Sequence, residues 1–148
     1  MDLLTGEFEN TLDEKGRISL PAKLRQKLSG SIVVLTKGYN NCVWVLPPEQ
    51  WDSVAEKFID ASLTFEKADF LHHQFITSMQ EVEIDRAGRI AIPLSLRKHA
   101  KLTRSCVILG TGKKMEIWDV NEYGDYLDAN ASRIKDILDE LGPISLFI

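Results

Sequence analysis

The sequence predicts an α+β protein made of two tandem copies of one unit, each a β-hairpin followed by a short basic helix. The first observation is an internal repeat: residues 12–25 return as residues 84–97 with a constant offset of 72 and no gap. Within it, Asp, Gly, Arg, Ile, Pro, Leu and the final Arg keep their places. The second observation is a strand-like alternation before a proline in both copies, and the third is a basic helical pattern after it. A match this long and ordered indicates a duplicated supersecondary unit.

The residues of each unit favour these elements for local reasons. Gly16 suits a tight turn because glycine adopts positive φ without steric cost. Residues 17–20 alternate polar and apolar, which is typical of a half-buried strand. Pro21 ends that strand and suits the first position of a helix, on which Leu24 marks the apolar face. The matching positions of the second copy are Gly88, 89–92, Pro93 and Leu96.

Each unit is followed by two further predicted strands with a turn between them. They are short, rich in apolar and β-branched residues, and bounded by Gly, Asn or Pro, at residues 31–36, 42–46, 105–109 and 115–118. Trp44 and Trp118 fall at matching places in these strands. Their apolar neighbours favour a place in a barrel core or a domain seam, and the alternative is a stacking platform for nucleic-acid bases.

Helices are predicted between the copies and after the second copy. One runs from Pro48 toward Asp60, with proline near its first position. Another starts at a Thr64 cap and ends before Glu81. A last helix, capped by Asp119 or Asn121, continues to Gly142-Pro143. The apolar tail at 144–148 docks on its own domain or on a neighbouring subunit, and the sequence does not decide between them.

Size and composition indicate a soluble globular protein. The chain has 148 residues, a length that corresponds to one ordinary domain or two very small ones. Its residues are 44% hydrophobic and 27% charged, which is typical of globular proteins. A half of this length buries only about 60% of its surface, so an isolated half would be marginally stable. No apolar run approaches the roughly 20 residues of a membrane span, and no export signal is visible at the N-terminus. A cytoplasmic protein without membrane association is therefore expected.

Positive charge is concentrated in the repeated unit, although the chain carries a net charge of −4. Residues 13–27 contain five basic and two acidic side chains, and residues 85–104 contain six basic and one acidic. Solvated surface charge would explain the helix lysines. It explains less well why the turn carries arginine in both copies, which favours an anionic partner.

No pattern predicts catalysis, a metal site or a cofactor. Cys42 and Cys106 lie in apolar runs without C-x-x-C spacing, which favours buried thiols over redox sensing. His72 and His73 are adjacent and would point apart on a helix. The segment 110–114 has glycines followed by lysine but lacks phosphate-loop spacing, so a hairpin turn is favoured. We expect no enzyme and no cofactor.

Asp13 and Asp85 are better explained as turn braces than as general bases. Each lies four residues before an arginine, where a carboxylate can accept hydrogen bonds from turn amides or from the guanidinium. We expect Asp13 with Gly16, and Asp85 with Gly88, to shape the two turns.

The Asp-x-x-x-Arg turn, the Ile-x-Leu-Pro segment after it, the Leu-Arg helix and a second copy about seventy residues on resemble the MraZ family. That family consists of bacterial transcriptional regulators with two AbrB-like domains. The resemblance implies two swapped-hairpin units forming a double-split β-barrel, with bounds at 7–54 and 83–126. A helical linker at 55–82 and a C-terminal helix and tail at 127–148 complete the expected organisation. It also implies homo-oligomeric rings of eight or more protomers on the nucleoid, bound to short direct repeats upstream of their own division and cell-wall operon.

The functional prediction is a sequence-specific DNA-binding repressor. Four turn side chains are expected to enter a major groove of double-stranded DNA, where arginine pairs bidentately with guanine: Lys15, Arg17, Arg86 and Arg89. Four side chains on or beside the helices are expected to contact phosphates: Lys23, Arg25, Arg97 and Lys101. The alternative is a ring-forming scaffold whose basic face docks an acidic protein. Salt dependence distinguishes the two, because phosphate binding weakens linearly in a log–log plot.

Overall fold

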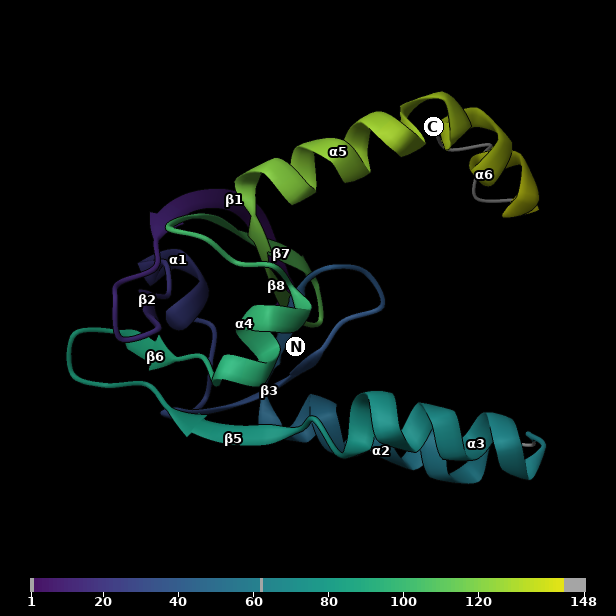
Figure 1. Cartoon of the computed structure of the whole chain (residues 1–148), viewed down its shortest axis with the longest axis horizontal. Helices are drawn as coiled ribbons and strands as arrows, with labels where there is room; N and C mark the ends of the chain where they lie inside the picture. Colours follow the sequence, from purple (N-terminus) through teal and green to yellow (C-terminus); the bar gives the residue numbers. More distant parts are fainter. Residues whose placement is uncertain (1, 62, 143–148) are drawn as a thin grey trace.

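The computed structural model describes residues 2–61 and 63–142, which form two antiparallel sheets and several helices (Figure 1). The strands are β1 (Leu4–Thr11), β2 (Arg17–Ser19), β3 (Ile32–Lys37), β4 (Val43–Leu46), β5 (Gln80–Glu83), β6 (Arg89–Ala91), β7 (Ser105–Gly112) and β8 (Met115–Asp119). The helices are α1 (Ala22–Arg25), α2 (Pro48–Asp60), α3 (Phe65–Leu71), α4 (Leu94–His99), α5 (Val120–Asn130) and α6 (Ile134–Glu140). A π-helical turn, η1 (His72–Ile76), follows α3, and a 3-10 turn, η2 (Ala131–Arg133), joins α5 to α6. The α+β class predicted from the sequence is confirmed.

Both sheets contain strands of both copies. The larger sheet has the order β1-β7-β8-β4-β3-β5, so β1 of the first copy pairs with β7 of the second, and β4 pairs with β8. The smaller sheet consists of β2 and β6 alone, with Ile18 opposite Ile90 at its centre. Because each copy supplies the pairing partner for strands of the other, the two copies form one interleaved structure.

The six-stranded sheet has a hydrophobic core on each face. Val33 and Leu35 point into the first core, which β2, β6, α1 and α4 cover with Ile18, Ile90, Leu24 and Leu96. Val34, between them, points into the second core with Trp44, Trp51, Phe75 and Trp118. The predicted strands read as continuous apolar runs because both of their faces are buried.

The expected double-split β-barrel is not seen to close within the described residues. Within the described residues, no ladder joins the edge strands β1 and β5, so the larger sheet is open and the β2–β6 ribbon covers one of its faces. The two tryptophans are buried side chains, as the favoured interpretation held, and they belong to the second core. Trp44 stacks on Phe75 at a centroid distance of 5.5 Å.

Helices leave the sheet as two arms on the same side of the molecule, α2 with α3 and α5 with α6 (Figure 1). The expected helix 64–80 instead changes from α to π geometry at His72. The expected continuous helix after Asp119 breaks at Asn130, whose side chain donates to the Tyr126 carbonyl at 2.8 Å and accepts from Arg133 at 2.8 Å. Such side-chain bonds compete with helical hydrogen bonding. The apolar tail 144–148 lies outside the described residues.

Candidate nucleic-acid interface

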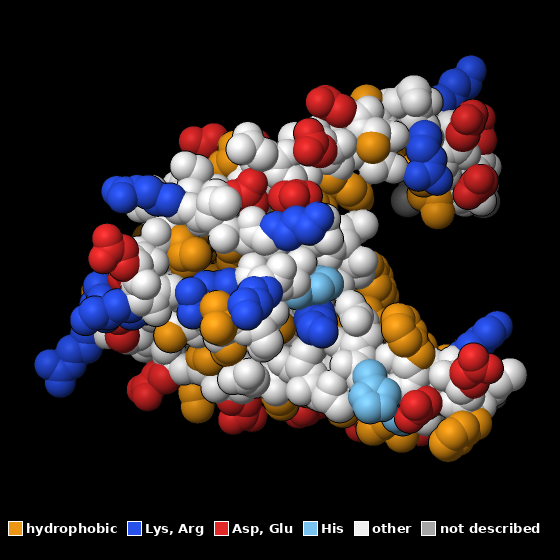
Figure 2. Space-filling model, in the orientation of Figure 1, with side chains coloured by type: hydrophobic (Ala, Val, Ile, Leu, Met, Phe, Trp, Pro, Cys, Tyr) orange, Lys and Arg blue, Asp and Glu red, His pale blue; other side chains and the backbone are white. Residues whose placement is uncertain are grey.

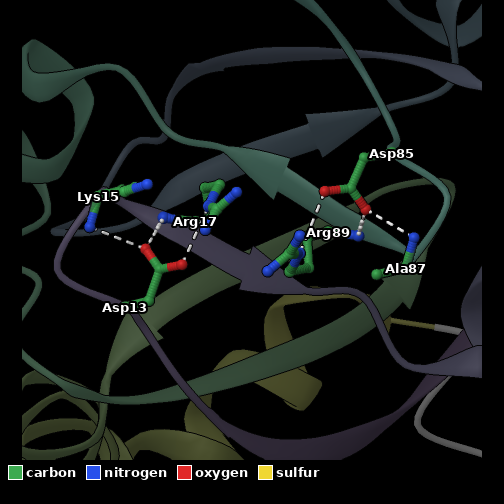
Figure 3. A network of polar contacts seen from close by, with 6 residues as sticks. All are labelled: Asp13, Lys15, Arg17, Asp85, Ala87 and Arg89. Atoms are coloured by element: carbon green, nitrogen blue, oxygen red, sulfur yellow. Dashed lines mark hydrogen bonds and ion pairs between the residues drawn. The ribbon is translucent and has the colours of Figure 1, made fainter.

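A single carboxylate organises the first turn (Figure 3). Oδ1 of Asp13 accepts hydrogen bonds from the backbone N–H of Lys15 at 2.9 Å and of Arg17 at 2.8 Å. Its Oδ2 accepts from Nε of Arg17 at 3.0 Å, while the backbone N–H of Asp13 donates to the Arg17 carbonyl at 2.9 Å. Gly16 adopts φ +79° within this closed turn. The hydrogen bond from the Arg17 backbone, followed by its side-chain bond, holds the pKa of Asp13 below its ordinary value.

The second turn has the same geometry. Oδ1 of Asp85 accepts from the backbone N–H of Ala87 and of Arg89, both at 2.9 Å, and Oδ2 accepts from Nε of Arg89 at 3.1 Å. Gly88 has φ +81°, and the backbone hydrogen bond from Arg89 lowers the pKa of Asp85. The repetition of every contact shows that the sequence repeat encodes one rigid turn twice.

The β2–β6 ribbon brings the two turn arginines onto a common outer face. Ile18 and Ile90, at the middle of the ribbon, are buried in the first core. Since side chains alternate along a strand, Arg17 and Arg89 point away from that core, and their side chains are 32% and 37% exposed. Nε of each arginine donates to its own aspartate, so this hydrogen bond does not use the two terminal nitrogens of the guanidinium.

The two turns present different side chains between their shared aspartate and glycine. The first carries Glu14 and Lys15, and the second carries Arg86 and Ala87; all four residues are exposed. The turns therefore share one backbone geometry but differ in the functional groups they offer a partner.

Arg25 and Arg97 lie against the turns, a location that their sequence positions did not indicate. Nε of Arg25 donates to the Leu20 carbonyl and Nε of Arg97 to the Ile92 carbonyl, both at 2.9 Å. The guanidinium of Arg97 covers Gly16 of the other copy. Both arginines are half-buried, unlike Lys23, which is exposed on α1.

Lys101 is placed beside an acidic side chain. Its Nζ lies 4.0 Å from Oε1 of Glu122 on α5, and its side chain is 63% exposed. The structure therefore gives this lysine a carboxylate neighbour, which the sequence alone did not predict.

Basic side chains gather where the ribbon lies. Figure 2 shows Lys and Arg side chains over the left end of the molecule, which carries β2, β6 and both turns. Acidic side chains are prominent along the α5 arm. The concentration of basic residues seen in the sequence therefore corresponds to one end of the folded chain.

The remaining sequence features have structural roles. Cys42 and Cys106 are free and buried, and burial raises the pKa of their thiols to about 12 and about 11. Residues 110–114 form the end of β7 and the turn to β8. Among residues 2–61 and 63–142, no group of three or more His, Cys, Asp or Glu side chains is placed to hold a metal ion. No helix in that part of the chain is long and apolar enough to cross a membrane.

Fold and site together define a class: a duplicated α+β protein in which two copies exchange strands to build one ribbon with two Asp–Arg turns. A family model described as "MraZ protein" matches residues 3–72 and again residues 75–139. The chain belongs to the MraZ family, with two repeats of its domain.

Relatives span nearly the whole chain. The Treponema denticola protein named transcriptional regulator MraZ is 40% identical over 142 residues, which is 95% of this chain and 99% of that protein. The Thermoanaerobacter sp. (strain X514) protein of the same name is 38% identical and covers 94% of this chain and 99% of its own. The Treponema pallidum (strain Nichols) protein is 44% identical over 83% of both chains. These relatives are named as transcriptional regulators, so the family is not one of enzymes.

A solved structure, the solution structure of PHS018 from Pyrococcus horikoshii, aligns with 79% of this chain and 89% of its own. Its TM-score is 0.32 at 16% identity, which is too low to establish a shared fold.

Proposed function

We propose that this protein is a sequence-specific DNA-binding transcriptional regulator that reads a major groove with its β2–β6 ribbon. The observation that carries this proposal is the shared outward face of Arg17 and Arg89, each oriented by its own aspartate. A two-stranded β-ribbon fits the major groove of B-DNA. The names of the relatives as transcriptional regulators support a DNA partner.

The proposed division of labour follows the geometry of the turns. Asp13 and Asp85 bind Nε of Arg17 and Arg89, so the terminal nitrogens of each arginine remain available for O6 and N7 of guanine. Lys15 and Arg86 extend from the turn tips toward neighbouring bases. Lys23, exposed on α1, contacts a phosphate and fixes the register. Lys101 retains a phosphate contact in this proposal, with Glu122 weakening it.

The target and the assembly are proposed from the family resemblance. The protein would repress its own division and cell-wall operon by binding direct repeats upstream, as a homo-oligomeric ring of eight or more swapped-hairpin protomers on the nucleoid in the cytoplasm. Exposed apolar side chains on the two helical arms support association between protomers: Ile59, Phe65, Phe70, Ile134 and Leu141. In a ring, the basic ends of several protomers would contact the same DNA duplex, although each chain has a net negative charge.

The deciding experiment measures binding to the DNA directly upstream of the chain's own coding sequence by fluorescence anisotropy. Wild type is compared with Arg17→Ala/Arg89→Ala, and with Lys67→Ala/Lys135→Ala as the matched control that removes two positive charges from the arms. Size-exclusion chromatography monitors assembly of all three proteins. We expect the turn variant to assemble normally and lose specific binding, while the control keeps it.

Salt dependence distinguishes DNA binding from the scaffold alternative. For a DNA-bound ribbon, log K falls linearly with log salt concentration with a slope of about −0.9 per phosphate contact. A wild type that assembles but ignores this DNA at low salt would reject the regulator and favour a scaffold with an acidic protein partner.

A further inference from the structure

Each turn is covered by an arginine that belongs to the other copy of the repeat. A Cβ placed on Gly16 would lie 2.8 Å from both Cζ and Nε of Arg97. A Cβ placed on Gly88 would lie 2.6 Å from Cζ and 2.7 Å from Nε of Arg25. Both glycines are buried, although the residues on either side of each within the turn are exposed or half-buried. Each guanidinium is therefore packed directly on the turn backbone of the opposite copy.

Hydrogen bonds fix each arginine in this place through a single linking residue. The backbone N–H of Ile92 donates to the Gly16 carbonyl at 2.8 Å, while the Ile92 carbonyl accepts from Nε of Arg97 at 2.9 Å. On the other side, Leu20 donates to the Gly88 carbonyl at 2.9 Å and accepts from Nε of Arg25 at 2.9 Å. Arginine, linking residue and glycine thus form a small cluster on both sides of the ribbon.

We propose that Arg97 is a positioning residue for the turn 13–17 and Arg25 for the turn 85–89, so that the base preference of each turn depends on an arginine of the other copy. This inference rests on the proposed function, because it concerns how the same ribbon reads DNA. It differs from the expectation that both arginines simply contact phosphates.

The geometry favours positioning for two reasons. First, the Nε donor of each arginine is used inside the protein, and the side chain is half-buried, whereas Lys23 and Lys98 on the same two helices are exposed. Second, a planar guanidinium can cover a glycine while donating sideways through Nε. A lysine has neither a planar head nor an Nε donor, so Arg→Lys keeps the charge but loses this contact.

The test compares charge-preserving variants on a panel of single-base substitutions of the bound DNA. Lys15→Ala and Arg86→Ala first identify the bases near each turn. We expect Arg97→Lys to reduce the preference for the original base over its substitutes about tenfold, and only at bases near the turn 13–17. The slope of log K against log salt concentration should not change. Arg25→Lys should have the mirror effect. As a control, Lys98→Ala should leave base discrimination unchanged throughout.

A simple phosphate role predicts a different pattern. In that case Arg97→Ala would weaken binding equally across the panel and reduce the salt slope by about 0.9. That result, or a change confined to bases near the arginine's own copy, would overturn the inference.

A measurement without DNA separates this inference from the proposed function. Hydrogen exchange is followed in the segments 11–20 and 83–92, with size-exclusion chromatography confirming assembly of each variant. Arg97→Lys should accelerate exchange in the first segment and leave the second near wild type, and Arg25→Lys should do the reverse. Equal rates in wild type and variants would overturn the positioning role, even if wild type binds DNA. If each variant accelerates hydrogen exchange in the turn of the other copy but the wild type does not bind DNA, only the proposed function is rejected.

Discussion

The guanidinium of Arg97 covers Gly16 so closely that a methyl group on the glycine would lie 2.8 Å from its Cζ. Gly16 also has φ +79°, which side chains of L-residues rarely adopt. Two independent features, the local backbone conformation and the guanidinium from the other copy of the repeat, therefore favour glycine at this position, and the backbone conformation is the stronger of the two.

Gly16→Ala should be strongly destabilising. The left-handed backbone alone costs about 1–2 kcal/mol for a residue with Cβ, and displacing Arg97 adds to it. Denaturant unfolding measures the change. Gly124→Ala is the matched control, because Gly124 lies inside α5 with open space around it. This substitution should raise the free energy of unfolding by about 0.5–1 kcal/mol. A similar effect of both substitutions would contradict the structure.

The aspartates of the turns predict a specific acid sensitivity. Because the folded-state pKa of Asp13 and Asp85 is below 3.8, their contribution to stability is complete above that pH and is lost as the pH falls through the folded values. The difference in unfolding free energy between wild type and Asp13→Asn/Asp85→Asn should therefore shrink over the range that begins about one pH unit above 3.8 and extends down through the folded pKa values. A difference that stays constant over this range would refute the role given to these carboxylates.

Strand exchange predicts that neither half of the chain folds alone. Residues 1–72 lack β6, β7 and β8, which pair with β2, β1 and β4. Circular dichroism of 1–72 and of 73–148 should show no cooperative unfolding, and a mixture should regain it. The full chain should unfold in one transition, since the first core draws Leu24 and Leu96 from different copies. Independent folding of either half would overturn this prediction.

The two thiols should be inert in the native protein. With pKa values raised to about 12 for Cys42 and about 11 for Cys106, almost no thiolate exists at pH 8, and both side chains are buried. A colorimetric disulfide reagent should modify neither thiol in the native protein and both after denaturation. Rapid modification of one native thiol would restore the redox-sensor hypothesis.

The sequence predicted the parts of the fold that have strong local patterns. The turns, the helix from Pro48 to Asp60 and the four strands rich in β-branched residues have clear boundaries because glycine, proline and apolar runs mark them. The strand β1 was not predicted, because the spacing of four residues between Leu4 and Phe8 fits one face of a helix as well as one face of a strand. The strand β5 was not predicted either, although Val82 and Ile84 alternate with Glu81 and Glu83 and pack against the first core.

The site was only partly predictable for the same reason. The sequence placed Asp13 four residues before Arg17, and a local turn was enough to explain that spacing. Which strands pair is decided by long-range packing, so nothing local indicated that Arg89 shares a ribbon with Arg17. The contact of Arg25 with Gly88 depends on the same pairing and was likewise not foreseeable from one copy.

The pairing of β1 with β7 also has a consequence during synthesis of the chain on the ribosome. Residue 4 finds its partner only at residue 112, so the emerging polypeptide must keep its first strand unpaired until most of the chain has been translated. The β2–β6 ribbon is subject to the same delay, because β2 cannot pair until β6 has been synthesised. Contacts this distant along the chain slow folding. A prematurely terminated product that lacks the second copy therefore has neither the core nor the paired arginines, and only finished molecules acquire the surface proposed to regulate transcription.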